Sequence, residues 1–268
     1  MTPEQLAHYR EHGYVVLRGL FSKDELTPWL DRLAALIRGD VPKADGMVMM
    51  RDVMVVKGAV VPGSDAEAIA KVQDFDADPV LRTYTEHPKL LAEVEHVTGE
   101  HIAVIHNMLI NKPPGVDGRH PLHQDLLYFP FRPPERIIAS WTALEPVNRE
   151  NGCLAVVPGS HRGGLLPHEN PDWEYLNLAY FGAAGVGAHP DRVHLEMEPG
   201  DTVFFDPLLL HGSGRNRSPG FRRAISSHYA AADCAFPEGV DSSAARRYRL
   251  VQGEIQPGGL LDATSPGR

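Results

Sequence analysis

Three side chains that can bind a metal stand in a pattern suited to oxidative chemistry. His123 and Asp125 are separated by one residue, and His211 follows much further along the chain. Two imidazoles and one carboxylate can occupy one face of an octahedral metal and leave the opposite face open for a bidentate co-substrate and O₂, as in non-haem Fe(II) oxygenases. An open face disfavours a structural zinc site, which needs a closed tetrahedron. The three residues therefore predict a reactive iron site.

An arginine after the second histidine could hold an anionic co-substrate, because a guanidinium pairs with a carboxylate through two parallel hydrogen bonds. Arg222 and Arg223 both stand in a suitable place. Neighbouring residues of a strand point to opposite faces, so one of the two is expected at the surface, and spacing alone does not decide which. Ser213, two residues after His211, would share its face and offer a second donor. This pattern predicts oxidation driven by 2-oxoglutarate.

Other polar residues near the predicted ligands compete for the same roles. Asp206 is an alternative carboxylate, and His120 and His228 are alternative imidazoles. We expect His120 to order the loop before the ligand strand. Gln124, between the first two ligands, points away from the metal in a regular strand and is a candidate for holding substrate or ordering the site.

Length and composition are those of a globular protein. The chain has 268 residues, of which 43% are hydrophobic and 23% charged, enough for one large core. Its net charge of −9 argues against general nucleic-acid binding, which needs a basic face. No apolar run approaches the roughly 20 residues of a membrane span. We therefore expect a small-molecule substrate and no membrane span.

The two ends of the sequence and its cysteines predict a cytoplasmic location. The first residues lack the basic stretch and apolar core of a secretory signal. The last residues, SPGR, do not form a peroxisomal SKL tail. Cys153 and Cys234 are outside any CxxC pattern, and we expect two free, packed thiols in a reducing compartment.

The elements that must position the site begin with helices. Residues 2–5 form a capping box before a short helix, and 13–17 read as a strand. A second capping box at 22–25 opens a longer helix that Gly39 ends. Residues 40–65 look like strand and loop, including strands at 47–50 and 53–56. At least one further helix is expected within 77–98.

From about residue 101 short apolar strands alternate with Gly/Pro turns, which is typical of a β sandwich or barrel. The sequence therefore predicts a mainly β fold with flanking α, a double-stranded β-helix or jelly roll with N-terminal helices packed outside. We expect a single domain over 1–268: a helical part at about 1–100, a core at about 101–235 and a C-terminal extension at 236–268. The expected strands are 101–110, 137–147, 153–157, 193–197, 201–206, 207–211 and 223–231.

The ligands fit the ends of these strands. His123 and Asp125, two residues apart on one strand, would point to the same face, and His211 would end another strand. A jelly roll brings distant strands together, so the separation of His211 from the first two ligands is no obstacle. The stretch 162–192, rich in Gly, Pro, His and aromatic residues, reads as a long insertion near the mouth of the site.

Beyond these patterns, most of residues 10–235 resemble the phytanoyl-CoA dioxygenase family. The resemblance is carried by MRDV at 50–53, KVQDF at 71–75, MLINKPP at 108–114, RHPLHQD at 119–125, YFPFRP at 128–133, NGCL at 151–154, GDTVFF at 200–205, HGSG at 211–214 and GFR at 220–222.

The resemblance implies a set of site residues. It places iron ligands at His123, Asp125 and His211, and it selects Arg222 rather than Arg223 for the distal carboxylate of 2-oxoglutarate. It also implies co-substrate contacts from Lys71, Met108, Trp141 and Ser213. Without it, Lys71 would be interpreted as a surface lysine, and Met108 and Trp141 as core. The implied cofactor and co-substrates are Fe(II), 2-oxoglutarate and O₂, with ascorbate as a candidate stimulant.

The resemblance also implies an activity: hydroxylation of a branched fatty acyl-CoA next to the thioester, with release of succinate and CO₂. Asp125 favours hydroxylation, because related halogenases replace this carboxylate with a small residue. CoA phosphates would need cations near the mouth, and the candidates are Arg51, Lys57, Arg119, Arg132 and Arg162. Residues 172–192 and those after about 236 diverge from the family, which leaves the acyl chain open.

Two alternatives stay open at this point. The same chemistry could act on an amino-acid-like solute or a secondary metabolite, which would not need the mouth cations. A non-catalytic jelly-roll module that binds a metal or small ligand would form no succinate under any condition. The sequence determines neither the stereochemistry nor the oligomeric state.

Overall fold

Two capped helices frame the first strand. We describe a computed structural model over 1–268, apart from residues 176, 178–179, 242, 244–246 and 263–268. In α1 (Pro3–His12) and α2 (Lys23–Arg38), the side-chain hydroxyl of the N-cap residue accepts a hydrogen bond from the backbone amide three residues later. The side chain of that later residue accepts a hydrogen bond from the backbone amide of the N-cap residue in return. Gly39, at φ 76°, ends α2 in the left-handed conformation. Both predicted capping boxes and the strand β1 (Tyr14–Leu17) are confirmed.

The next segment differs from the sequence prediction. β2 (Val48–Arg51) forms as expected, but residues 53–56 form the short helix α3 (Val53–Val56) instead of a strand. The β-branched residues favour a strand only weakly, and the Asp52 side chain accepts from the Met54 amide at 2.8 Å, which starts a helical turn. After α4 (Asp65–Ala68) comes an unpredicted strand, β3 (Ile69–Gln73).

A group of short helices then leads to the core. It comprises η1 (Phe75–Ala77), α5 (Arg82–Thr85) and α6 (Pro88–Thr98). Leu90, Leu91 and Val94 form the buried face of α6, and the helix expected within 77–98 is confirmed. No helix in the described part of the chain is both long and apolar enough to cross a membrane.

Two antiparallel sheets form the core. The larger sheet has the order β1-β11-β6-β13-β4-β3-β2, with β14 also paired to β4, and the smaller has the order β10-β7-β12-β5. A small two-stranded sheet, β8 with β9, packs beside β5. This is the predicted jelly roll. The remaining strands are β4 (Ile102–Lys112), β5 (His120–His123), β6 (Ile137–Ala143), β7 (Leu154–Val156), β8 (His168–Glu169), β9 (Gly182–Ala183), β10 (Val193–Leu195), β11 (Thr202–Phe205), β12 (His211–Ser213), β13 (Arg222–Ala231) and β14 (Arg249–Gln252).

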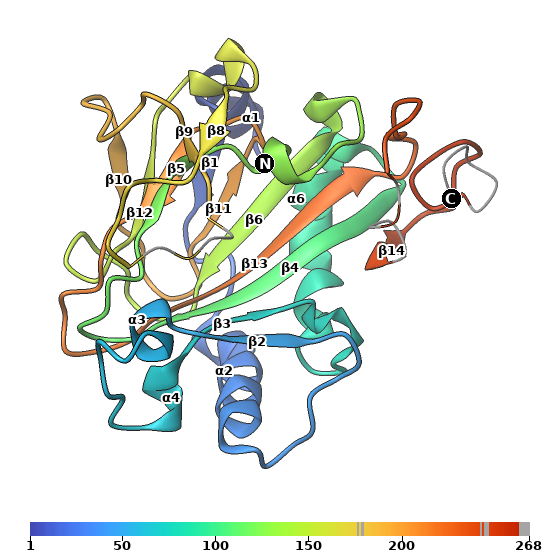
Figure 1. The fold of residues 1–268 in the computed structure, drawn as a ribbon. Helices are drawn as coiled ribbons and strands as arrows, with labels where there is room; N and C mark the ends of the chain where they lie inside the picture. Colours follow the sequence, from blue (N-terminus) through green and yellow to red (C-terminus); the bar gives the residue numbers. More distant parts are fainter. Residues whose placement is uncertain (176, 178–179, 242, 244–246, 263–268) are drawn as a thin grey trace.

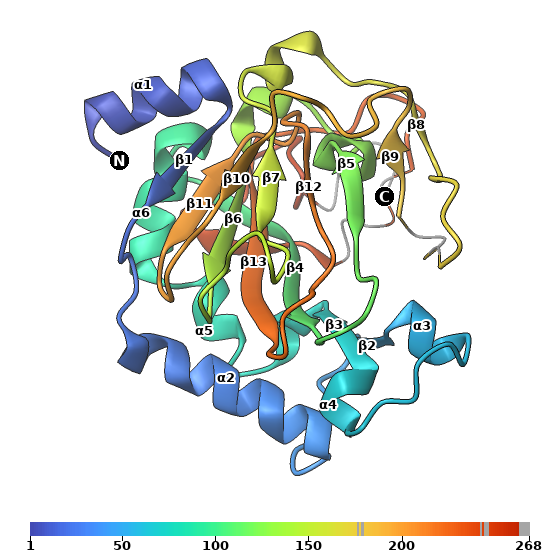
Figure 2. The same ribbon diagram turned by 90° about the vertical axis from the view of Figure 1, so that its left-hand side faces the viewer.

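The large sheet separates two apolar layers. Alternate residues of β11 point to opposite faces: Phe204 packs with Trp29 of α2 and Leu90 of α6, whereas Phe205 packs between the two sheets. Figures 1 and 2 show α2 and α6 on one side of the large sheet and the small sheet on the other. The helices thus cover the outer face, and the inner face is left to build a site.

One predicted strand is wrong. Residues 207–211 form a turn, and only His211 begins a strand, β12. The Leu208 amide donates to the Asp206 carboxylate at 2.8 Å, and the Leu209 amide donates to the Asp206 carbonyl at 2.9 Å. An aspartate that binds the backbone two residues ahead favours a turn over a strand, so the apolar character of Leu208 and Leu209 was misleading.

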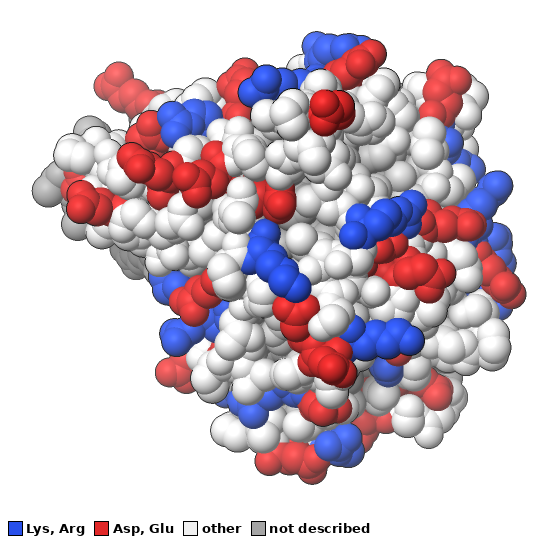
Figure 3. Space-filling view, turned by 180° about the vertical axis from the view of Figure 1, so that it is seen from behind, with Lys and Arg blue, Asp and Glu red and all other residues white. Residues whose placement is uncertain are grey.

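The surface seen from behind has mixed charges. Figure 3 shows Lys and Arg interspersed with Asp and Glu over this face. Ion pairs on the protein surface include Arg38 with Asp40 at 2.7 Å and Lys89 with Glu25 at 2.8 Å. Interspersed charges of this kind are typical of a solvated surface.

Candidate active site

Strand register brings the predicted metal ligands together. β5 and β12 are neighbours in the small sheet, and His123 and His211 are direct partners across them. Their rings lie 4.3 Å apart, centre to centre. With Asp125 they form a buried group whose ligand atoms all lie within 4.8 Å of one another and could hold a metal ion.

Asp125 reaches this group in an unexpected way. It does not continue the strand of His123 but opens the turn η2 (Asp125–Tyr128), so the predicted strand placement is wrong. Gln124 stands between the end of β5 and the start of η2. Its fully buried side chain donates to the carbonyls of Gly164 and Leu208 and accepts from the Leu166 amide. These bonds tie the ligand segment to the 207–210 turn and to the start of the 162–192 stretch.

The histidines are oriented for metal binding. Nδ1 of His123 lies 2.9 Å from the Pro121 carbonyl, and Nδ1 of His211 lies 3.0 Å from the Leu209 carbonyl. Since a carbonyl only accepts, each Nδ1 must carry the proton, and each Nε2 lone pair is free for a metal. Burial lowers the pKa of His211 to about 4, so its imidazole is neutral at physiological pH, as metal binding requires.

The two oxygens of Asp125 have different partners. Oδ1 lies 3.2 Å from Nε2 of His123, while Oδ2 accepts from Nε2 of His228 at 2.7 Å. Burial opposes ionisation of Asp125, but His211 and His228 beside it outweigh burial, and the pKa of the carboxyl lies well below its usual range. His228 thereby occupies Oδ2, which also lies 3.6 Å from Nε2 of His211, and leaves Oδ1 toward His123.

Sequence reasoning treated His228 only as a competing ligand, yet it lies on β13 only 2% exposed. Its Nδ1 is buried without a partner among the described residues. The strand alternation held the missing clue, because His228 shares the face of Arg222 and Ser226, and all three line one cavity.

The structure distinguishes the two adjacent arginines. Arg222 is 2% exposed, and its Nε and Nη1 have no partner among the described residues. Arg223, on the opposite face, pairs with Glu145 at 2.8 Å and with Asn111 at 2.8 Å. Burial lowers the pKa of Arg222 to about 10, which keeps it a cation at neutral pH. Unpartnered buried donors are costly in a folded protein, so Arg222 is suited to an anionic ligand.

A second buried cation, Lys112, lies beside Arg222. The two are direct partners across β4 and β13. Nζ of Lys112 donates to Oγ of Ser213 at 2.8 Å and to the Gly214 carbonyl. Burial, with Arg222 next to it, holds the pKa of Lys112 well below its usual range. Because Ser213 accepts from Lys112, its own hydroxyl proton is free to donate into the cavity. Sequence reasoning missed Lys112, although it shares the face of Met108 and Ile110 on β4.

The other implied contacts lie around the same cavity, which has a volume of about 420 Å³. Lys71 is buried rather than a surface lysine, and its Nζ lies 4.9 Å from the centre of the Tyr180 ring. Met108 lines the cavity, and Trp141 faces Arg222 with an indole nitrogen that has no partner among the described residues. We call the triad, Lys112, Ser213 and Arg222 the inner end of the cavity.

Only some of the cations predicted near the mouth line the cavity. Arg51 and Arg119 line it; Lys57, Arg132 and Arg162 do not. Arg119 pairs with both oxygens of Asp117 and lies 4.1 Å from the centre of the Trp173 ring. Trp173, from the 162–192 stretch, also lines the cavity, as does Arg247 near the C-terminus. We call Arg51, Arg119, Trp173, Arg247 and Tyr248 the mouth.

Among the remaining candidates, His120 begins the ligand strand β5 and lines the cavity. The ring of His120 packs against those of His123 and Tyr180, at 4.6 and 3.9 Å between centres. Asp206 caps the turn before β12 and does not line the cavity. Cys153 and Cys234 are both free and buried, and burial raises their pKa to about 11 and about 12.

A double-sheet jelly roll with a buried His-Asp-His group facing a buried arginine defines the class of non-haem, 2-oxoglutarate-type oxygenase folds. A family model described as "Phytanoyl-CoA dioxygenase (PhyH)" matches residues 9–224. The chain belongs to the phytanoyl-CoA dioxygenase family.

Relatives and solved structures agree with this assignment. "Phytanoyl-CoA dioxygenase, peroxisomal" of Mus musculus is 47% identical over 238 residues, covering 87% of this chain and 70% of that protein. "Probable phytanoyl-CoA dioxygenase" of Caenorhabditis elegans is 45% identical over 237 residues, covering 86% and 75%. The structure of EctD from S. alaskensis with bound Fe has a TM-score of 0.67 at 22% identity, covering 88% of this chain and 79% of that one. EvdO2 from Micromonospora carbonacea var. aurantiaca, complexed with 2-oxoglutarate, has a TM-score of 0.66 at 20% identity, covering 90% and 95%; at these identities the likeness concerns the fold.

Proposed function

We propose that this protein is an Fe(II)- and 2-oxoglutarate-dependent hydroxylase. Its reaction would place a hydroxyl on the carbon next to the thioester of a branched fatty acyl-CoA such as phytanoyl-CoA, with release of succinate and CO₂. The observation that carries the proposal is the shared cavity, in which the triad faces Arg222 and its two unpartnered nitrogens. The names of the relatives support the substrate class.

The donor set fits iron. His123 and His211 would each present Nε2, held in place by the carbonyl bond at Nδ1, and Asp125 would present one oxygen while His228 holds the other. When bound there, iron supplies the O₂ activation that oxidises the co-substrate and attacks an unactivated C–H bond. Two neutral imidazoles and one carboxylate leave a single positive charge on the centre, which an anionic 2-oxo acid can neutralise.

The chain's own residues would then bind and orient 2-oxoglutarate. Arg222 offers Nε and Nη1 to the distal carboxylate, and Ser213 offers its hydroxyl proton. Lys71 adds a further positive charge to the cavity, and Met108 and Trp141 contribute apolar walls that lower the local dielectric. With water largely excluded, the charge-assisted bonds to Arg222 are stronger than they would be at the surface.

The test is succinate release by anaerobically Fe(II)-loaded protein on exposure to O₂ and 2-oxoglutarate, with and without ascorbate. Phytanoyl-CoA, a straight-chain acyl-CoA, free phytanic acid and no added substrate are compared, and the His123→Ala variant is the control. Turnover stimulated by the CoA thioesters and lost in the variant is expected. Turnover no greater than that of the variant with every substrate would overturn the acyl-CoA assignment.

We also propose a cytoplasmic location. The two buried free thiols support a reducing compartment, whereas the name of the mouse relative specifies the peroxisome. Fractionation of cells that produce the protein at its native level, with cytoplasmic and organellar markers, tests this location; co-sedimentation with an organelle would overturn it.

A further inference from the structure

The segment 247–252 returns to the cavity after the core is complete. Its strand β14 pairs with the start of β4, with Arg249 opposite Val104 and Leu250 opposite Ala103. Figure 1 shows β14 beside that end of the large sheet. In the chain it follows β13, the last strand of the core. The family model ends at residue 224, so this segment lies outside the matched region.

Two residues of the segment, Arg247 and Tyr248, line the same cavity as the triad. Arg247 pairs with Asp74 at 3.0 Å, and its side chain is 66% exposed at the mouth. Tyr248 is half-buried, and its ring packs edge-on against Phe131 at 5.8 Å between centres. The segment is therefore placed to contact anything longer than 2-oxoglutarate that enters the cavity.

A row of aromatic rings connects Tyr248 to the metal ligands. Phe131 lies 5.9 Å from Phe129, and Phe129 lies 5.0 Å from His228, which binds Asp125. Phe129 and His228 both line the cavity. Phe131 is fully buried and does not line the cavity, so it supports Tyr248 and Phe129 from behind. The rings of Tyr248 and Phe129 give the cavity wall apolar surface of the kind a hydrocarbon chain would contact.

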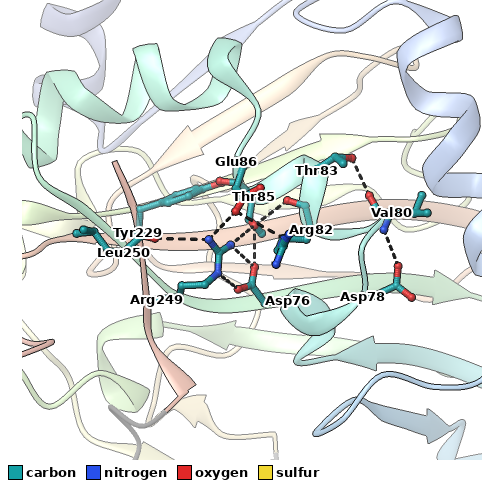
Figure 4. A network of polar contacts seen from close by, with 10 residues as sticks. All are labelled: Asp76, Asp78, Val80, Arg82, Thr83, Thr85, Glu86, Tyr229, Arg249 and Leu250. Carbon is teal, nitrogen blue, oxygen red and sulfur yellow. Dashed lines mark hydrogen bonds and ion pairs between the residues drawn. The ribbon is translucent and has the colours of Figure 1, made fainter. Parts of the chain in front are cut away.

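A polar network fixes the segment to the helical part. Arg249 donates to both oxygens of Asp76, to Glu86 at 2.6 Å and to Thr85 at 3.3 Å. The Thr85 carbonyl also accepts from the hydroxyl of Tyr229 on β13. Figure 4 shows the Arg249 guanidinium between Asp76 on one side and Glu86 and Thr85 on the other. A planar guanidinium with this many acceptors holds its backbone in one place, and Tyr248 is the adjacent residue.

We propose that 247–252 forms the outer wall of the substrate cavity. Tyr248 is the residue of this wall that selects the acyl chain, and Arg249 holds the segment in place. The proposal rests on the hydroxylase function proposed above. The ring of Tyr248 would contact the part of the chain furthest from the thioester, so it would affect which chains are accepted and not how 2-oxoglutarate is held. Arg249 is a positioning residue, because it acts through Tyr248.

The test compares Tyr248→Ala with Tyr248→Phe, which keeps the ring, and Arg249→Met with Arg38→Met, which removes a surface ion pair away from the cavity. For each variant, kcat/KM is measured for phytanoyl-CoA and for hexadecanoyl-CoA, together with KM for 2-oxoglutarate. Binding of the fluorescent fatty acid cis-parinaric acid to metal-free protein gives a second readout that needs no turnover.

We expect Tyr248→Ala to change the ratio of the two kcat/KM values by about tenfold or more, the size of a lost apolar contact in a substrate pocket. KM for 2-oxoglutarate should stay constant, Tyr248→Phe should behave as the unchanged protein, and Arg249→Met should shift the ratio in the same direction as Tyr248→Ala. Arg38→Met should shift nothing.

The experiment distinguishes an error in the proposal about 247–252 from an error in the proposed function. An unchanged selectivity ratio and unchanged probe binding in Tyr248→Ala would overturn the wall, as would a loss of selectivity in Tyr248→Phe equal to that in Tyr248→Ala. If the unchanged protein turns over neither thioester but Tyr248→Ala weakens probe binding, the acyl-CoA function fails and the wall is supported.

Discussion

The inner end of the cavity and its mouth are built by different means. Every residue at the inner end is buried or nearly so and stands on or next to a strand of β4, β5, β12 or β13. The mouth is built from β2, the loop before β5, the 162–192 stretch and the C-terminal segment, and its charges are partly exposed and mostly paired with carboxylates.

This difference indicates a division of labour. At the inner end, donors such as Arg222 Nε and Nη1 are buried without partners among the described residues, and such groups reduce stability unless a ligand satisfies them. At the mouth, Arg119 and Arg247 already have partners and lose little when no ligand is bound. In the proposed function, the inner end would hold the co-substrate and the mouth would contact the substrate.

The largest effect is expected from removal of an iron ligand. His123→Ala should lower succinate formation by more than about a hundredfold, because losing a direct ligand exceeds the 10- to 100-fold typical of an outer partner. A titration with Co(II), followed by its visible absorption, should show metal affinity lost with the activity. Full metal affinity in this variant would place the centre elsewhere in the cavity.

The two adjacent arginines give a matched pair. Arg222→Met should raise KM for 2-oxoglutarate about 30-fold or more, since truncating one partner of a buried charged hydrogen-bond pair costs about 2–5 kcal/mol. Arg223→Met removes a cation one residue away that pairs with Glu145 outside the cavity. It should leave KM unchanged and cost roughly 1–3 kcal/mol of stability, because the buried side chain of Asn111 loses its donor. Equal effects of the two on KM would refute the assignment of the inner end.

His228→Ala tests the support of Asp125. The variant loses the 2.7 Å bond that occupies Oδ2, so the carboxylate can rotate, and metal affinity should fall about 10- to 100-fold. His106→Ala is the control: its ring lies 5.6 Å from that of His228, but its Nε2 contacts Gln73 and not a ligand. Unchanged Co(II) affinity in His228→Ala would show that His228 only packs against Asp125 and does not support metal binding.

Local signals in the sequence predicted the helices and the ligand set. Capping boxes at Thr2 and Ser22 determine helix starts within a few residues, and they appear in the structure. Residues 53–56 show the limit of the same reasoning. Their three valines favour a strand, but the hydrogen bond from the Met54 amide to the Asp52 side chain starts a helix.

Long-range pairing explains what the sequence could not show. Lys112 stands opposite Arg222 only because of the register between β4 and β13. His228 reaches Asp125 only because β13 passes beside η2. Alternation along one strand tells which residues share a face, but not which face lines a cavity or which residue stands opposite. A family resemblance supplied Lys71 and Trp141, whereas Lys112 and His228 needed the structure.

A smaller effect is expected at the mouth. Arg119→Met should raise KM for phytanoyl-CoA by at most about fivefold, because a partly exposed charge contributes about 1 kcal/mol or less. Asp117 keeps a partner in Arg215 at 2.8 Å, so the loop should remain in place. The measurement is kcat and KM at two salt concentrations. A rise of a hundredfold would show that this arginine holds a phosphate tightly, and the contrast between the two ends of the cavity would disappear.

No effect on turnover is expected from Asp206→Asn, which changes a partly buried carboxylate outside the cavity. Burial raises the pKa of Asp206 from 3.8 to about 6. The folded protein therefore holds this proton more tightly than the unfolded chain, and stability falls as pH rises from about 4 to 6. The asparagine can still accept from the Leu208 amide, and it carries no charge to bury.

The variant should thus gain stability relative to the unchanged protein above pH 6, by less than about 3 kcal/mol since the group is partly exposed. Below pH 4 the two proteins should be equally stable. Urea unfolding of both metal-free proteins at pH 4.5 and 7.5 measures the difference. A variant that is less stable at pH 7.5, or that loses Co(II) affinity, would show that the Asp206 charge serves the site. In that case Asp206 would support the site although it lies outside the cavity, and the contrast with the groups that line the cavity would be wrong.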